Sequence, residues 1–140
     1  MARTDEAEAF FTAVYLACQE IPRGRVTSYG HIGRLIGKPE CPRQVGICLR
    51  HLPTDPDAEF NSDSVPWQRV INSRGVISPR RHSSGASRQA TALEQEGVAV
   101  ERGSLGELKV DLEVYGWFPR RLPSREDDGD YSDELEGDEE

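Results

Sequence analysis

The sequence predicts a mainly α-helical domain with small β-hairpins, organised around a helix-turn-helix. Apolar residues recur at helical intervals in an N-terminal stretch and in two short segments that a glycine-containing turn separates. Further along the chain, short runs of β-branched residues flank glycine turns, which is typical of hairpins. A length of 140 residues fits one domain with an adequate hydrophobic core.

The first helix is predicted from Asp5 to about Glu20, and Pro22 and Gly24 end it. Its apolar positions, spaced three or four residues apart, are Phe10, Val14, Ala17 and Ile21. Residues 25–27 are expected to form a short extended link.

The second helix is predicted from Tyr29 to about Ile36. Thr27 or Ser28 is expected to cap it, because a hydroxyl can accept a hydrogen bond from the first turn. Gly37 ends it, because glycine adopts the left-handed conformation that terminates helices.

The third helix is predicted from Pro42 to about Leu52, since proline suits a first helical turn. Its inward face is expected to carry Val45, Cys48, Leu49 and Leu52. The opposite face carries Arg43, Gly46, Ile47 and Arg50. A helix that lies against DNA needs small residues for close approach and cations for phosphates, and this face partly offers both.

The most distinctive stretch is VPWQRVINSRG, residues 65–75. Pro66 forces a turn that displays Trp67 and Gln68. The pairs Val70-Ile71 and Val76-Ile77 are predicted to form a hairpin around the turn that ends on Gly75. The neighbouring cations are Arg69, Arg74, Arg80 and Arg81. Together these features suggest a pocket with a positive rim. Residues 53–64, before this stretch, are expected to form a surface loop.

The C-terminal part is predicted to hold one more helix, Ser87–Glu96, which Gly97 ends. A final hairpin is expected to join residues 98–101 to residues 108–112. The following aromatic residues, Tyr115, Trp117 and Phe118, are expected to pack back on the core. The domain is therefore placed at residues 5–118. Residues 119–140 are expected to be an acidic tail that begins as a linker and is disordered from Glu126 onward.

The net charge of −8 is concentrated in that tail. Residues 126–140 hold ten acidic residues and no Lys or Arg, so the remaining chain carries 17 Lys+Arg against 15 Asp+Glu. Residues 20–91 hold eleven Lys+Arg and six Asp+Glu. This asymmetry suits a nucleic-acid binder, with a tail that either screens nonspecific DNA contacts or docks a partner. A merely solubilising tail is the alternative.

The cysteines favour an intracellular protein. Cys18, Cys41 and Cys48 are odd in number and lack the spacing of a disulfide framework. We expect no metal, because Cys41, Cys48 and His51 lack a fourth ligand at a familiar spacing. No cofactor is expected, and neither a signal peptide nor a membrane-spanning run is found.

Four motifs in order, VTSYGHIG, CPRQVGICLRHL, VPWQRVINSRG and LEQEGV, resemble the O6-alkylguanine-DNA alkyltransferases. The resemblance spans roughly Phe10 to Trp117. It implies a winged helix-turn-helix-like DNA-binding domain, as in the C-terminal domain of those transferases. The sequence is more similar still to their non-catalytic relatives, the alkyltransferase-like proteins.

The resemblance implies that alkyl transfer is lost. The transferases carry Pro-Cys-His-Arg where this chain has Pro66-Trp67-Gln68-Arg69. Their cysteine thiolate takes the alkyl group, and a histidine and a distant glutamate help to deprotonate it. Indole offers no ionisable nucleophile and glutamine cannot act as a base, so only Glu96 of that relay is retained. Tryptophan at this position marks the alkyltransferase-like proteins, although their usual next residue is histidine.

The implied function is recognition of O6-alkylguanine in double-stranded DNA. The lesion nucleotide is flipped out of the stack, and the complex marks the site for nucleotide excision repair proteins. Such a protein is expected to be a monomer that contacts no membrane and, in a eukaryote, lies in the nucleus.

The resemblance assigns roles to individual residues. Arg43 is the finger inserted through the minor groove, and Tyr29 rotates the phosphate 3′ to the flipped nucleotide. The other expected DNA-binding residues are Ser28, Gln44, Gly46 and Arg50. The lesion pocket is expected to comprise Trp67, Gln68, Arg69, Val70, Arg80 and Glu96. Arg81 could replace Arg80, and Gln68 is either a pocket residue or a turn former.

Two other functions remain open from the sequence. One is an active methylated-DNA–protein-cysteine methyltransferase that uses another thiol. The other is a winged-helix regulator that recognises undamaged sequence. Transfer of an alkyl group to any cysteine would favour the first, and equal affinity for damaged and undamaged duplexes would favour the second.

Overall fold

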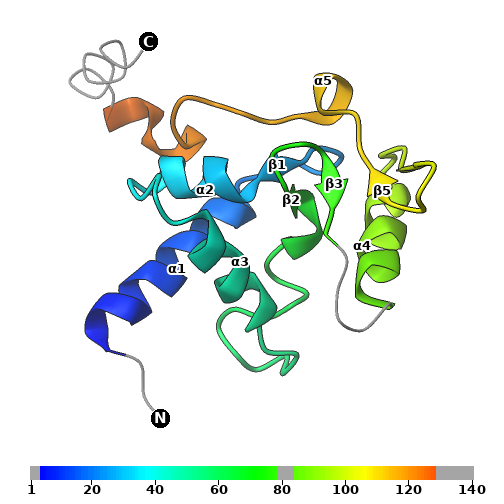
Figure 1. Cartoon of the computed structure of the whole chain (residues 1–140). Helices are drawn as coiled ribbons and strands as arrows, with labels where there is room; N and C mark the ends of the chain where they lie inside the picture. Colours follow the sequence, from blue (N-terminus) through cyan, green and yellow to red (C-terminus); the bar gives the residue numbers. More distant parts are fainter. Residues whose placement is uncertain (1–3, 79–83, 129–140) are drawn as a thin grey trace.

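A computed structural model of the chain describes residues 4–78 and 84–128 (Figure 1). Its α-helices are α1 (Asp5–Gln19), α2 (Tyr29–Leu35), α3 (Pro42–Arg50), α4 (Ser84–Gln95) and α5 (Leu112–Tyr115). Two 3₁₀ helices are η1 (Trp67–Arg69) and η2 (Pro123–Asp128). The strands are β1 (Thr27–Ser28), β2 (Val70–Ile71), β3 (Val76–Ile77), β4 (Glu101–Arg102) and β5 (Leu108–Lys109).

The first three helices confirm the predicted helix-turn-helix with a supporting N-terminal helix. The hydroxyl of Thr4 caps α1 by accepting from the amide of Ala7 at 3.1 Å. Ser28, one of the two expected caps, accepts from the amide of His31 at 3.0 Å and starts α2. The helices end one or two residues earlier than the apolar spacing predicts, as terminal turns commonly do.

The predicted pairing of β2 with β3 is wrong, although both strands exist and the turn between them forms, with the amide of Asn72 donating to the carbonyl of Val76 at 3.3 Å. β2 pairs in parallel with β1, whereas β3 pairs antiparallel with β5. The side chain of Asn72 explains the difference. Its Oδ1 accepts from the amides of Arg74 and Val76 at 2.9 and 3.0 Å, so the Val76 donor is not available for a hairpin ladder. Gly75 closes the turn at φ +82° and directs β3 into the other sheet.

The last predicted hairpin is confirmed in shorter form, because β4 pairs antiparallel with β5. Together β3, β5 and β4 form a three-stranded sheet. The segment at residues 112–115 is a short helix, α5, rather than the end of a strand. Asp111 caps it by accepting from the amide of Glu113. The helix α4 begins three residues before the predicted start at Ser87.

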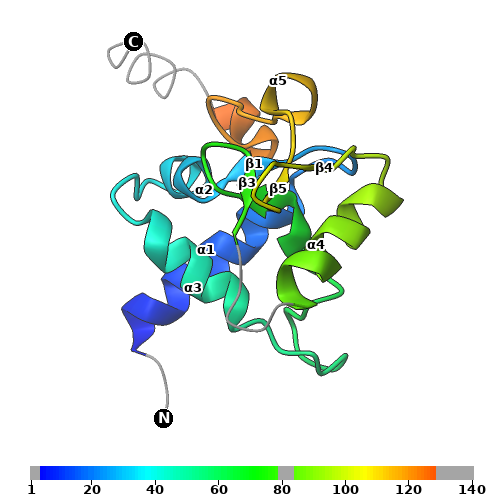
Figure 2. The same cartoon turned by 45° about the vertical axis from the view of Figure 1, so that its right-hand side comes forward.

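The buried side chains form two clusters. The first lies among α1, α2 and α3, and the second lies between α4 and the three-stranded sheet. Figures 1 and 2 show the same division, with the first three helices on one side and α4 with the sheet on the other. The neighbouring residues Val70 and Ile71 are both fully buried, and each enters a different cluster. β2 therefore joins the two halves.

The chain after α5 packs further than expected. Tyr115 lies against the second cluster and Trp117 against the first, as predicted. Phe118 remains 45% exposed. Beyond it, Leu122 joins the first cluster, and Ser124 donates from its hydroxyl to Glu20 at 2.6 Å. The segment at residues 119–125, predicted as linker, thus packs on the first helices, with the carbonyl of Pro119 hydrogen-bonded to His31 of α2 and with Leu122 and Ser124 beside α1.

The sequence predicts disorder from Glu126 onward, but residues 126–128 belong to η2, and residues 129–140 lie outside the described residues. Within residues 4–78 and 84–128, no helix is both long enough and apolar enough to cross a membrane.

Replacing Gly75 with alanine should destabilise the fold by roughly 2–3 kcal/mol. A Cβ there would adopt a strained φ and lie 2.5 Å from the carbonyl oxygen of Val110. Urea denaturation measures the loss. Gly97→Ala is the matched control, because Gly97 also has a positive φ but no atom within 4 Å of the added carbon. Equal losses in the two variants would show that the Val110 contact has no effect.

Candidate nucleic-acid interface

One face of α3 brings three of the predicted DNA-binding residues together. The ring of Tyr29, from the start of α2, lies 3.7 Å from the position of a Cβ on Gly46. The guanidinium of Arg50 lies at the same distance from that position. Because Gly46 has no side chain, the ring of Tyr29 and the guanidinium of Arg50 can both lie against it.

Arg43 lies on the same face, one turn before Gly46, and is exposed. Among residues 4–78 and 84–128, none forms a hydrogen bond or ion pair with its guanidinium. Pro42 begins the helix, so Arg43 extends from the first turn of α3. An exposed cation at this position is free to reach a ligand.

The remaining two predicted DNA-binding residues lie differently. Ser28 is 5% exposed, and its hydroxyl is engaged in capping α2. Gln44 is exposed on the side of α3 that faces α1, where it lines a hollow with Phe10 and Ile47. The geometry therefore groups Tyr29, Gly46 and Arg50, with Arg43 one turn earlier on α3, while Ser28 is buried at the start of α2 and Gln44 lies to one side.

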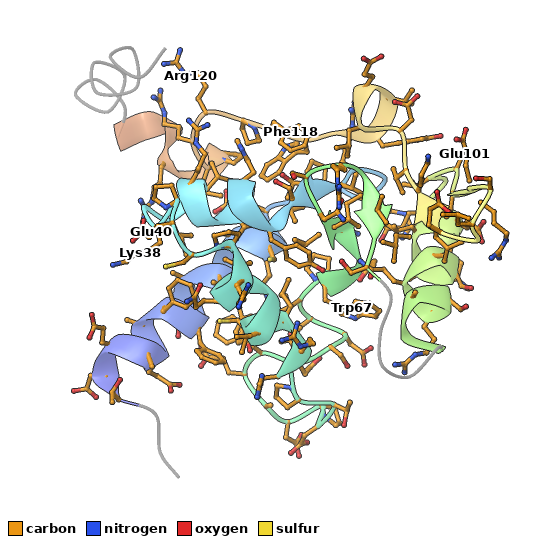
Figure 3. All side chains as sticks on the ribbon, viewed as in Figure 1. Lys38, Glu40, Trp67, Glu101, Phe118 and Arg120 are labelled. Carbon is orange, nitrogen blue, oxygen red and sulfur yellow. The ribbon has the colours of Figure 1, made fainter. Side chains whose placement is uncertain are left out.

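The predicted lesion residues are centred on η1. Trp67 is partly exposed and belongs to neither buried cluster. In Figure 3 its indole extends from η1 toward the side of the molecule that carries α4. Val70 follows η1 and is fully buried in the first cluster. Arg80, the remaining cation assigned to the pocket, lies outside the described residues, as does Arg81.

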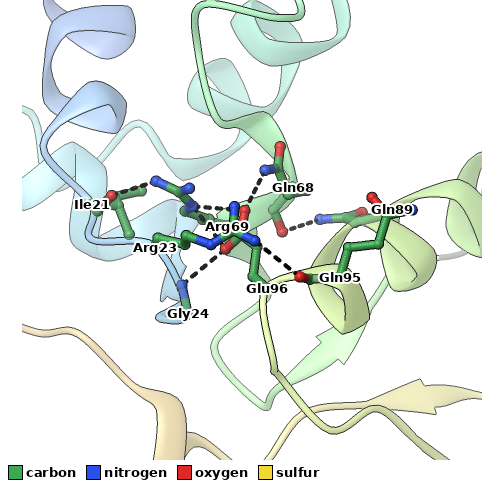
Figure 4. Close-up of polar contacts among 8 residues, drawn as sticks. All are labelled: Ile21, Arg23, Gly24, Gln68, Arg69, Gln89, Gln95 and Glu96. Carbon is green, nitrogen blue, oxygen red and sulfur yellow. Dashed lines mark hydrogen bonds and ion pairs between the residues drawn. The ribbon is translucent and has the colours of Figure 1, made fainter.

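The side chain of Glu96 lies at the centre of a hydrogen-bond network (Figure 4). Its carboxylate accepts from Nε of Arg69 at 3.0 and 3.1 Å and from Nε2 of Gln68 at 2.8 Å. It also accepts from the amide of Gly24 at 2.9 Å. Arg69 donates in addition to the carbonyl of Ile21 at 2.7 Å. We call these residues the Glu96 cluster.

The Glu96 cluster is buried and its charges are paired. The side chains of Arg69 and Glu96 are only 15% and 4% exposed. Burial alone would raise the pKa of Glu96, but the hydrogen bonds from Arg69, Gly24 and Gln68 outweigh it and lower the pKa. The carboxylate is therefore ionised at neutral pH. Because Arg69 is committed to this cluster, it does not contribute a free cation to a positive rim.

Gln89 is a functional residue that the sequence interpretation missed. It is 1% exposed, and its Nε2 donates to the carbonyls of Gln68 and Val70 at 3.1 and 3.0 Å. These bonds fix the backbone of η1 and β2 to α4. The signal was present, because Gln89 lies at helical spacing from Leu93 and Glu96, on the inward face of α4.

The thiols are poorly placed for chemistry. Cys18 and Cys48 are buried in the first cluster. Burial raises the pKa of Cys18, and the neighbouring Cys48 raises it further, so this thiol does not ionise. Cys41 is partly exposed just before α3. Among residues 4–78 and 84–128, no three His, Cys, Asp or Glu side chains gather as metal ligands would.

Comparisons with known proteins show the family of this chain. Residues 9–98 match the family described as 6-O-methylguanine DNA methyltransferase, DNA binding domain. Alkyltransferase-like protein 1 of Schizosaccharomyces pombe is 49% identical over 84% of this chain and 99% of its own length. A DNA base-flipping protein of Escherichia coli is 35% identical over 82% of this chain and 79% of its own.

Two solved structures extend the comparison. The S. pombe protein in complex with damaged DNA containing O6-carboxymethylguanine superposes with a TM-score of 0.70 and 48% identity, covering 84% of this chain and all of that one. The Mycobacterium tuberculosis OGT in complex with DNA has a TM-score of 0.54 and 33% identity, covering 68% of this chain and 51% of that one.

Replacing Glu96 with glutamine should destabilise the fold by roughly 2–4 kcal/mol at pH 7, because Arg69 loses its buried partner. Since the folded pKa lies below the ordinary 4.5, the carboxylate stabilises the wild type above that pH. Its contribution is lost as the pH falls through the folded pKa. Denaturant unfolding at several pH values should show the two proteins converging under acid conditions. The control Glu94→Gln, an exposed change on α4, should stay close to the wild type.

Proposed function

This chain belongs to the alkyltransferase-like branch of the 6-O-methylguanine DNA methyltransferase DNA-binding-domain family, and we propose that it recognises O6-alkylguanine in duplex DNA. It binds the lesion and turns the nucleotide out of the stack without transferring the alkyl group. The relatives support this proposal, because one is called a DNA base-flipping protein and another binds DNA that contains O6-carboxymethylguanine.

The observation that carries the proposal is the indole of Trp67 on η1. The resemblance places the transferases' nucleophilic cysteine at this position, and indole has neither an ionisable thiol nor a lone pair suited to displacement. Gln68 beside it cannot accept a proton at neutral pH. An apolar ring that is partly exposed is instead a suitable wall for an alkyl group.

The α3 face supplies the docking surface in this proposal. Gly46 is buried beneath Tyr29 and Arg50, and its lack of a side chain lets both lie close to the backbone of α3, while Arg50 meets phosphates. Arg43 enters through the minor groove and fills the space that the flipped nucleotide leaves, because a guanidinium plane stacks on bases. Tyr29 turns the phosphate on the 3′ side. Flipping costs a few kcal/mol of unstacking, and less at a weakened alkylguanine pair.

The Glu96 cluster forms the rigid support of the lesion pocket. It holds Gln68 and Arg69 by their side chains, while Gln89 holds the backbone on the other side. A pocket with fixed walls need not be ordered by the ligand, which favours tight binding. The resemblance assigns Arg80 to a contact between its cation and the flipped base.

We further propose that the bound complex marks the lesion for nucleotide excision repair proteins. A protein that holds an alkylated base but cannot repair it needs a second system to remove the damage. The protein acts as a monomer in this role, and in a eukaryotic cell it acts in the nucleus.

Arg43→Ala should abolish most of the preference for an O6-methylguanine duplex over a guanine duplex, with roughly a tenfold or greater loss of lesion affinity. Tyr29→Ala should reduce the preference less. Competition binding by fluorescence anisotropy, at two salt concentrations, separates lesion preference from general affinity. Arg102→Ala removes an exposed cation from β4 and is the control. An unchanged preference in Arg43→Ala would argue against the finger role.

Incubation with an oligonucleotide that contains O6-benzylguanine should leave every cysteine unmodified. In intact-mass analysis we expect no increase of about 90 Da, which is the mass gained when a benzyl group replaces a hydrogen. Trp67→Cys should also react negligibly, because Gln68 cannot take the thiol proton. Modification of the wild type at Cys41, checked with Cys41→Ser, would identify the protein as a transferase instead.

A further inference from the structure

Two hydrogen bonds hold Gln68, one at its backbone and one at its side chain, and they allow its side-chain amide only one orientation. Its backbone carbonyl accepts from Nε2 of Gln89 at 3.1 Å, and its own Nε2 donates to Oε2 of Glu96 at 2.8 Å. Gln89 is 1% exposed and also donates to Val70, so the backbone anchor is itself fixed. Gln68 therefore behaves as a preorganised group and not as a mobile surface side chain.

The chemistry of Glu96 determines which end of the amide faces it. An ionised carboxylate only accepts hydrogen bonds, so the amide nitrogen of Gln68 must point toward it. The opposite orientation would bring two oxygen atoms together at hydrogen-bond distance. The other donors to this carboxylate, Arg69 and the amide of Gly24, prevent Glu96 from turning to release Gln68.

The side-chain carbonyl oxygen of Gln68, Oε1, consequently points away from Glu96 (Figure 4). Among residues 4–78 and 84–128, none donates a hydrogen bond to this oxygen. Gln68 is only partly buried and is the direct neighbour of Trp67 on η1. The site thus presents a fixed acceptor that a ligand can use.

We propose that Oε1 of Gln68 accepts a hydrogen bond from the flipped nucleotide and so selects for nucleotides that carry a donor. This inference rests on the proposed lesion binding and deepens it. Alkylation at O6 removes the N1 hydrogen of guanine, so the 2-amino group is the one donor left on the base edge. A hydroxyl on the O6 substituent is the second source of a donor.

Two matched pairs of duplexes distinguish these sources. The first compares O6-methylguanine with O6-methylhypoxanthine, which lacks the 2-amino group. The second compares O6-(2-hydroxyethyl)guanine with O6-propylguanine, which has a similar size but no hydroxyl. Anisotropy competition measures each affinity. In at least one pair, the wild type should bind the duplex that carries the hydrogen-bond donor roughly three- to tenfold more tightly, as one hydrogen bond allows.

Gln68→Met removes the acceptor while keeping the size of the side chain. It should bind the two duplexes of each pair with about equal affinity. Gln68→His should restore the preference for the donor at pH 8, because a neutral imidazole donates to Glu96 with one nitrogen and accepts with the other. Gln95→Met, an exposed change on α4, should behave like the wild type. A thermal melt checks that each variant is folded.

The outcomes separate this inference from the proposed function. A wild type that favours O6-methylguanine over guanine, but keeps its donor preferences in Gln68→Met, overturns the role of Gln68 alone. That role is also overturned if the wild type shows no donor preference in either pair. A wild type that does not distinguish O6-methylguanine from guanine overturns the proposed function, and this inference with it.

Discussion

The buried pair of Arg69 and Glu96 is the interaction on which the candidate site depends. Its charges join three segments that are distant in sequence, since Glu96 follows α4, Arg69 belongs to η1, and Ile21 and Gly24 lie between α1 and β1. A buried ion pair contributes little net stability when compared with apolar packing, but it is specific in geometry, because each lone pair needs its donor. The pair therefore fixes where η1 lies. It is a positional constraint more than a source of stability.

The retained glutamate gains a different meaning in this setting. In the transferases that the sequence resembles, the glutamate belongs to a relay that activates a thiol. Here the same side chain receives donors on both oxygens and has no thiol to activate. A residue whose catalytic purpose is gone can still be required, because removing it would leave the guanidinium of Arg69 buried without a partner. The buried pairing with Arg69 gives a structural reason for a glutamate here in a chain with tryptophan at position 67.

The helices and the family could be predicted from the sequence, whereas the strand pairing and the hydrogen-bond network could not. Helix spacing, Ser28 as a cap and the glycine stops are local signals, and they located α1, α2, α3 and α4 to within a few residues. The predicted pairing of strands across Gly75 was wrong because the side chain of Asn72 accepts the amide hydrogen of Val76. No pattern of β-branched residues reveals this contact. The contacts of Glu96 with Gly24 and Gln68 span 72 and 28 residues, so they depend on the completed fold.

The junction at Val70 and Ile71 has a consequence for how this protein tolerates sequence change. Two adjacent side chains anchor the strand in separate apolar clusters, and the indole of Trp67 lies only three residues before them. A substitution that shifts either cluster by a fraction of an ångström would tilt the strand, because packed interiors transmit displacement. Mutations in either apolar cluster, far from any DNA contact, would therefore change the affinity for damaged DNA before they unfold the protein.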